Sequence, residues 1–104
     1  MKPIRQGDVI LLPVKPTEGK KPDDRHEVLH HLVLAEGEVT GHKHRISDGI
    51  AQLYTEDSSL HLRVFSGNAL LVHEEHGCIN VPQGDWMVRI QREYEPEGWR
   101  YVAD

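Results

Sequence analysis

The segment Leu60-His-Leu-Arg-Val-Phe65 decides the fold class of this chain. Aliphatic residues at its first, third and fifth positions alternate with His61, Arg63 and Phe65. A period of two predicts a β-strand that places one face on a hydrophobic core and the other toward solvent. The segment Trp86–Gln91 shows the same alternation, so two half-buried strands are expected in this part of the chain.

Further short strands are predicted on both sides of this segment, with turn residues between them. The expected strands cover residues 9–12, 27–36, 42–46, 50–54, 69–72, 78–81 and 99–102. Polar turns are expected at 66–68 and 82–85, and no helical period is sustained for three turns. Many short strands with turn signals predict an all-β fold, mostly antiparallel, in the form of a single small barrel or jelly roll.

Length and composition predict one soluble domain over residues 1–104, with a mobile loop near 13–25. The chain has 104 residues, of which 38% are hydrophobic and 28% are charged. It contains no apolar run of the roughly 18 residues that a membrane span needs, and its start lacks an apolar signal core. We therefore expect a cytoplasmic protein without a membrane partner. Cys78 is the single cysteine and is expected to be a small buried or half-buried thiol.

The charge distribution argues against nucleic acid as a ligand, because the net charge is -5 and the basic residues are scattered. The eight histidines are the unusual feature of the composition. They are dispersed along the chain, so they are not a purification tag, and a histidine-rich composition is typical of metal binding.

The best-spaced histidines are His42 and His44, in the segment Gly37-Glu-Val-Thr-Gly-His-Lys-His-Arg-Ile46. Side chains two residues apart in a strand leave on the same face, so the two imidazoles can share a metal ion. A solvent-exposed or hydrogen-bonding pair is the alternative. Because both residues lie near a turn, we expect the chain to stay folded when both are replaced by alanine.

A second pair, His73 and His76, lies in the segment His73-Glu-Glu-His76. Three residues along a flat strand would point to opposite faces, so this pair converges only if Glu74 and Glu75 bend the chain. The predicted metal ligands are His42, His44, His73 and His76. An imidazole-rich site suits zinc, nickel, copper or ferrous iron better than calcium or magnesium.

Several other polar and aromatic residues have two interpretations. Asp48, Glu74 and Glu75 are either functional residues, as carboxylate ligands or as partners that orient an imidazole, or solvated turn residues. Among the remaining histidines, His30 and His31 are expected to be structural, and His26 and His61 to lie at the surface. Arg92 and Glu93 either contact a substrate or partner or form a local ion pair. Core and edge packing is expected for Tyr54, Trp86, Tyr94, Trp99 and Tyr101.

Two families resemble parts of this chain. The first cupin motif, a glycine followed by His-x-His and an acidic residue, is similar to Gly37, His42, His44 and Asp48. The second, a glycine with a Pro-x-Gly turn, is similar to Gly77, Pro82 and Gly84. Met87 stands where the final cupin histidine is expected, so His73 or His76 would have to supply that nitrogen. This resemblance implies a small β-barrel with a metal site.

The second resemblance is to short uncharacterised bacterial and phage proteins and runs through most of the chain. It is carried by Gln6-Gly-Asp-Val, Gly37-Glu-Val-Thr-Gly-His-x-His-Arg, His73-x-Glu-His-Gly and Gln91-Arg-Glu-Tyr-x-Pro96. It implies that both histidine segments and the Gln-Arg-Glu-Tyr segment belong to one recurring design, and it implies no activity.

Two functions from different classes follow. The first is a metal-binding cupin-like protein with zinc, nickel or iron. If it is an enzyme, the ion would act on a small-molecule substrate as a Lewis acid or activate water or oxygen, with Glu74 or Glu75 as base. The second is a non-catalytic interaction or structural module without a functional metal, either as a single chain or as a homo-oligomer. A histidine pair acting as metal-free acid and base is a third hypothesis.

Overall fold

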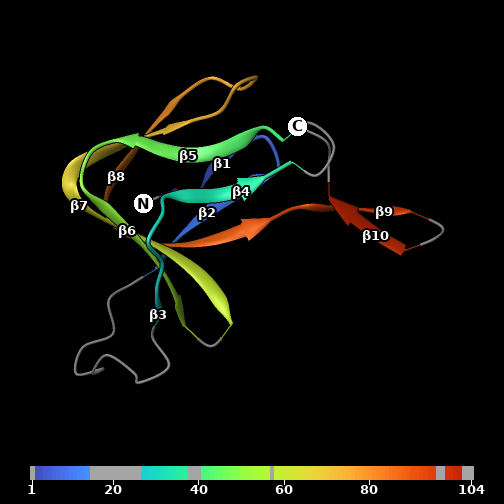
Figure 1. Cartoon of the computed structure of the whole chain (residues 1–104), viewed down its shortest axis with the longest axis horizontal. Helices are drawn as coiled ribbons and strands as arrows, with labels where there is room; N and C mark the ends of the chain where they lie inside the picture. Colours follow the sequence, from blue (N-terminus) through green and yellow to red (C-terminus); the bar gives the residue numbers. More distant parts are fainter. Residues whose placement is uncertain (1, 15–26, 38–40, 57, 96–97, 102–104) are drawn as a thin grey trace.

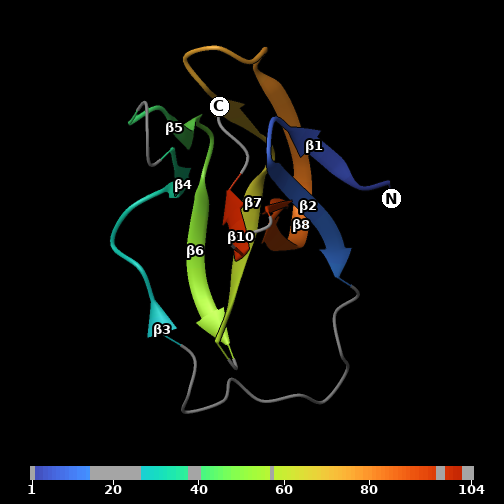
Figure 2. The ribbon, with the colours of Figure 1, turned by 90° about the vertical axis from the view of Figure 1, so that its right-hand side faces the viewer.

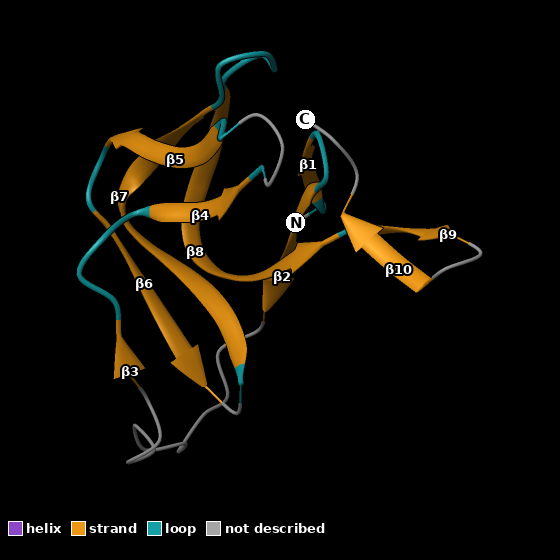
Figure 3. Ribbon diagram, turned by 45° about the vertical axis from the view of Figure 1, so that its right-hand side comes forward, coloured by secondary structure: helices purple, strands orange, loops and turns teal. Residues whose placement is uncertain are grey.

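The computed structural model describes residues 2–14, 27–37, 41–56, 58–95 and 98–101. Every regular element among them is a β-strand (Figure 3), so the all-β prediction is confirmed. No helix in this part of the chain is long and apolar enough to cross a membrane. The strands are β1 (Ile4–Gln6), β2 (Val9–Val14), β3 (Glu27–Val28), β4 (Val33–Glu36), β5 (Lys43–Asp48), β6 (Ala51–Glu56), β7 (Ser59–Val72), β8 (Ile79–Ile90), β9 (Arg92–Glu95) and β10 (Gly98–Tyr101).

Eight strands form one antiparallel sheet in the order β1-β2-β8-β7-β5-β4, with β6 paired to β7 and β3 paired to β6. Strands β9 and β10 form a separate two-stranded sheet that projects from the main body (Figure 1). The backbone pairing leaves β1 and β4 at the two ends of the order, and closure into a barrel or jelly roll stays a prediction. Of the loop expected near 13–25, residues 13 and 14 belong to β2 and the others lie outside the described residues.

The core lies on one face of the strands, as the alternation predicts. Leu62 and Val64 of β7 are buried, and their neighbours on β8 and β6, Trp86 and Leu53, pack on the same side. The full cluster is Val9, Leu11, Leu34, Ile46, Leu53, Leu62, Val64, Ala69, Leu71, Val81, Trp86 and Val88. Burying such aliphatic and aromatic side chains is the main term that stabilises a fold of this size.

Strands β7 and β8 are long and bent, and the turns predicted at 66–68 and 82–85 are wrong. Val64 pairs with Gly84 and Asn68 pairs with Pro82, so the register shifts between these two pairs. This irregularity bends both strands without ending either of them, which is the usual effect of a β-bulge (Figure 2). Glycine and proline mark bulges as well as turns, so the sequence signal has two structural outcomes.

The bulge is stabilised by the turn between β5 and β6. The backbone N–H groups of Phe65 and Ser66 both donate to the carbonyl of Ile50, at 2.8 and 3.3 Å. In return, the N–H of Ile50 donates to the Ser66 hydroxyl at 3.0 Å. Backbone groups that the bulge removes from the ladder therefore find partners in this turn.

The bend gives the two halves of β7 different neighbours. Residues 59–64 pair with β6, whereas residues 70–72 pair with β5. Because Arg45 pairs with Val72, His44 lies opposite the first residue of the loop that joins β7 to β8. The fold therefore brings the first histidine segment beside the second.

The strand predicted over 27–36 is also wrong in its middle. The structure has β3 and β4 with an irregular segment, 29–32, between them. Within this segment Leu29 donates its N–H to the Leu53 carbonyl, and the Leu32 carbonyl accepts from Ile46. Both faces of the predicted strand are mostly apolar, so its pattern does not reveal where the chain leaves one neighbour and joins another.

The turn at Gly49 allows a direct test of this packing. Gly49 has φ of 96°, and a Cβ there would lie 2.6 Å from the Asn68 carbonyl oxygen and 2.8 Å from the Ala69 Cα. We expect Gly49→Ala to lower the free energy of unfolding by about 1–3 kcal/mol in urea denaturation. Gly67→Ala is the control, because a Cβ at Gly67 meets nothing within 4 Å, and its effect should stay within about 0.5 kcal/mol. Equal effects of the two substitutions would contradict the packing of this turn against β7.

Candidate functional site

The four histidines predicted as ligands meet at one end of the main sheet. His42 lies directly before β5, His44 lies within β5, and His73 and His76 belong to the loop of residues 73–78. The chain bends at 74–76, as convergence of the second pair requires. The ring centroids of His44 and His73 lie 4.2 Å apart, those of His73 and His76 4.5 Å, and those of His42 and His73 5.6 Å.

His44 is wholly buried and hydrogen-bonded at both ring nitrogens. Its Nδ1 lies 2.9 Å from Gln6 Oε1, and its Nε2 lies 3.1 Å from Asp8 Oδ1. The amide nitrogen of Gln6 donates to the carbonyls of Leu71 and Gly77, at 3.1 and 2.9 Å, which fixes the amide oxygen toward His44. Nδ1 therefore donates its proton to the Gln6 amide oxygen, and Nε2 is occupied by its contact with the Asp8 carboxyl group.

This hydrogen bonding changes the interpretation of His44. Neither ring nitrogen offers a lone pair to a metal while both bonds are present, so the ligand role predicted for His44 is disfavoured in this arrangement. Removal of a buried side chain that satisfies Gln6 and Asp8 should destabilise the chain, and the expectation that it stays folded after His42 and His44 are both replaced stays a prediction.

A tight hairpin positions Gln6 and Asp8 on the two sides of the His44 ring. Gln6 pairs with Val9, so Gly7 and Asp8 form a two-residue loop between β1 and β2. Gly7 has φ of 59°, as expected for glycine at the first position of a type II′ turn. The short loop lets two side chains from one hairpin reach the same ring.

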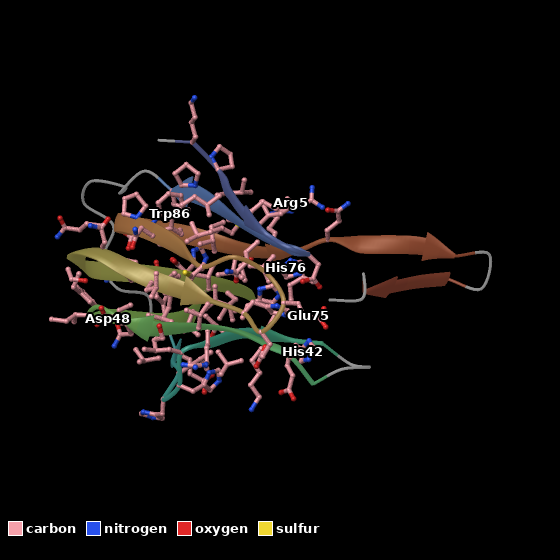
Figure 4. All side chains as sticks on the ribbon, turned by 90° about the horizontal axis from the view of Figure 1, so that it is seen from above. Arg5, His42, Asp48, Glu75, His76 and Trp86 are labelled. Carbon is pink, nitrogen blue, oxygen red and sulfur yellow. The ribbon has the colours of Figure 1, made fainter. Side chains whose placement is uncertain are left out.

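The carboxylates of the 73–78 loop face the first histidine segment. Glu74 Oε2 accepts the backbone N–H of Lys43 at 2.8 Å, and Glu75 Oε1 lies 3.4 Å from His42 Nδ1. The Lys43 amide is the main cause that lowers the pKa of Glu74, followed by the amide of Glu74 itself and by His42 and His73. Glu74 is therefore held as an exposed carboxylate beside two imidazoles, and Figure 4 shows its neighbour Glu75 next to His42.

His73 has a defined tautomer in this structure. Its Nδ1 accepts the backbone N–H groups of Glu75 and His76, at 3.0 and 3.3 Å. A nitrogen that accepts two N–H groups carries no proton, so the proton of the neutral ring is on Nε2. His73 thus stabilises the bend that positions the two glutamates, and a metal at either ring nitrogen would have to displace a proton or these amide contacts.

Three residues of this cluster could hold a metal ion together. One ligand atom each of His42, His73 and Glu74 lies within 4.8 Å of the others. His73 is buried, His42 is half-buried and Glu74 is exposed, so the group extends from the interior of the domain to its surface. Two imidazoles and one carboxylate are a donor set suited to zinc and to first-row transition metals.

Other residues considered as candidates lie apart from the cluster. Asp48 is exposed and lies far from His42, Glu75 and His76 (Figure 4). His30 and His31 are exposed in the irregular segment, where the N–H of Val33 donates to His31 Nδ1. His26, and the side chains of Arg92 and Glu93, lie outside the described part of the chain.

Two sequence expectations about burial are wrong. His61 is 7% exposed rather than a surface residue, because its ring stacks on Tyr54 with centroids 5.0 Å apart. The Arg63 guanidinium lies 5.1 Å above the Tyr54 ring and donates to Asp85 at 2.6 Å, so this second face of the sheet is also covered. Cys78 is exposed instead of buried or half-buried.

Sequence reasoning missed the roles of Gln6 and Asp8. Gln6 and Asp8 lie 38 and 36 positions before His44, which both of them contact, and neither has a spacing typical of a ligand. The signal that could have found them is the Gln6-Gly-Asp-Val segment, which the second resemblance already groups with the histidine segments.

The fold and the cluster define an all-β domain with a histidine- and glutamate-lined site. The chain belongs to the family of a domain of unknown function, DUF8820, whose family model matches residues 5–91. This range contains Gln6, Asp8 and every residue of the histidine cluster. No curated protein and no solved structure matches the sequence.

His44→Ala tests whether the buried network stabilises the domain. The substitution leaves Asp8 and Gln6 buried without their partner, and we expect the free energy of unfolding to fall by about 3–5 kcal/mol. The measurement is urea denaturation monitored by circular dichroism at neutral pH. The control is His30→Ala, an exposed histidine, for which a change within about 0.5 kcal/mol is expected. A His44→Ala protein as stable as the control would show that the network contributes little.

Proposed function

We propose that this domain binds one divalent transition metal ion through His42, His73 and Glu74. The observation that carries the proposal is that the ligand atoms of these three residues lie within 4.8 Å of one another. They come from two chain segments that the pairing of β5 with β7 brings together. A surface carboxylate alone would be unremarkable, but here it faces two imidazoles and its pKa is lowered.

The donor set favours zinc, nickel or iron over calcium and magnesium, which prefer oxygen ligands. Three protein ligands would leave a coordination position for water or a small molecule, as in catalytic metal sites. His76 lies next to His73 and is the candidate for a fourth ligand. Glu75, which pairs with His42, would orient that imidazole.

The finer parts of the proposal are a cupin-like metal centre, a small-molecule substrate, a homo-oligomeric state and a cytoplasmic location. Support for the cupin-like part comes from His42 and the all-β fold. Asp48 does not contribute to it, because this residue lies apart from the cluster. Catalysis would require the open coordination position, so metal binding is the step to test first.

The second candidate is a structural or interaction module without a functional metal. Two observations favour it: both nitrogens of His44 are hydrogen-bonded within the domain, and His73 Nδ1 accepts two backbone amides. On this interpretation the imidazoles hold β5 and the 73–78 loop together. Metal titration separates the two candidates.

The test is a zinc titration of untagged protein by isothermal calorimetry, with metal content measured on protein purified without chelators. We expect about one equivalent of metal per chain. His42→Ala and Glu74→Gln each remove one donor and should weaken zinc binding at least about 10-fold. His30→Ala, an exposed histidine outside the cluster, should bind as the parent does.

A parent protein that takes up neither zinc, nickel nor iron would support the metal-free module. Binding that is equally strong in the parent, His42→Ala and Glu74→Gln would place the metal elsewhere and contradict the proposed ligands. Binding that falls equally in His30→Ala would indicate nonspecific coordination by surface histidines.

Metal binding should also change the backbone of the 73–78 loop. A metal at Nδ1 of His73 would compete with the N–H groups of Glu75 and His76 for this nitrogen, so for that mode of binding we expect the hydrogen exchange of these two amides to become faster on zinc addition. Proton NMR exchange rates measure the effect, and the amide of Leu62 in the core serves as the internal control. Unchanged exchange with zinc bound would exclude Nδ1 of His73 as the ligand atom and would leave Nε2 as the nitrogen that this residue can offer.

A further inference from the structure

Gln6 makes three hydrogen bonds to three separate parts of the chain. Its amide nitrogen donates to the Leu71 carbonyl at 3.1 Å and to the Gly77 carbonyl at 2.9 Å, and its amide oxygen faces His44 Nδ1 at 2.9 Å. The side chain is only 2% exposed. Because the buried amide of Gln6 has a partner for each of these hydrogen bonds, it restricts how the three chain segments can lie relative to one another.

The two carbonyls lie on either side of residues 73–76, the part of the loop that carries the proposed ligands His73 and Glu74. Leu71 is near the end of β7, and Gly77 follows the bend at 74–76. Gln6 therefore bridges the base of this loop. The third bond fixes the ring of His44, which lies 4.2 Å from the ring of His73 between centroids.

We propose that Gln6 is the positioning residue of the metal site, closing the base of the 73–78 loop and fixing the His44 ring against which His73 packs. This inference rests on the proposed metal function. Gln6 would not touch the ion. It would act through His73 and Glu74, by restricting the loop to the conformation in which these side chains face His42.

The three hydrogen bonds require the amide of a glutamine side chain at this position. The two carbonyls need N–H donors, and the protonated Nδ1 of His44 needs an acceptor. Methionine has a similar volume but offers no N–H donor to the carbonyls. Glutamate keeps an acceptor for His44 but, when ionised, places an oxygen against two carbonyl oxygens. Methionine therefore removes the contacts with both the loop and His44, glutamate removes only those with the loop, and the difference between the two variants reports the contact with His44.

The experiment compares Gln6→Met and Gln6→Glu with two controls, Gln91→Met and Val64→Ala. Gln91 is an exposed glutamine whose side chain contacts Arg5, and Val64 is a core residue that does not belong to the loop. Zinc affinity is measured by calorimetry at a temperature where every variant is folded. Hydrogen exchange of the Glu75 and His76 amides is measured on the metal-free proteins, so this readout does not depend on metal binding.

We expect zinc binding to weaken about 10–100-fold in Gln6→Met and Gln6→Glu, the range found when a residue that orients ligands is removed. The amides of Glu75 and His76 should exchange faster in both variants without metal. Val64→Ala should lower the unfolding midpoint while leaving zinc affinity and these two amides unchanged. Gln91→Met should resemble the parent in every measurement.

Parental zinc affinity and parental amide exchange in Gln6→Met would overturn the inference. So would a Val64→Ala protein that loses affinity as strongly as Gln6→Met, because the effect would then reflect general stability. If Gln6→Met does not fold, Gln6→Glu decides by the same readouts. A parent that binds no zinc contradicts the proposed function, and the amide exchange of the metal-free variants then still shows whether Gln6 orders the loop.

Discussion

The hydrogen bonding of His44 is the constraint on which the rest of the site depends. A buried imidazole between an amide oxygen and a carboxylate is tolerated only if both nitrogens are satisfied, since an unpaired polar group in the core costs several times what a hydrogen bond contributes. Gln6 and Asp8 meet this requirement from a hairpin with a two-residue loop. A slip of one residue in that hairpin would turn both side chains away, so the network also specifies the register of β1 and β2.

The bend in β7 and β8 forms the site, because it brings this network beside the 73–78 loop. Because each half of β7 pairs with a different strand, β5 is placed beside the loop that follows Val72. His42 and Lys43 then face Glu74 and Glu75 across a short distance. A straight hairpin would keep β7 against one neighbour along its whole length, and the two histidine segments would not meet.

Within the cluster, three of the four histidines have different roles. His44 belongs to the interior and His73 accepts the amides of its own loop, whereas His42 lies half-exposed beside two carboxylates. The set that could hold a metal therefore combines two of the four histidines with Glu74. Sequence spacing indicated that His73 and His76 converge only if Glu74 and Glu75 bend the chain. It could not show which nitrogens were already engaged, because tautomers follow from partners that are distant in sequence.

The sequence by itself determined the all-β class, the core side of β7 and β8, and the two histidine segments, because alternation and spacing are local properties of the chain. It did not determine that glycine and proline at 66–68 and 82–85 bend strands rather than end them, nor that Gln6 and Asp8 complete the site. Those outcomes depend on which backbone groups find partners across the sheet. Only the tertiary structure decides this, since a bulge and a turn share the same residues and differ in their distant hydrogen bonds.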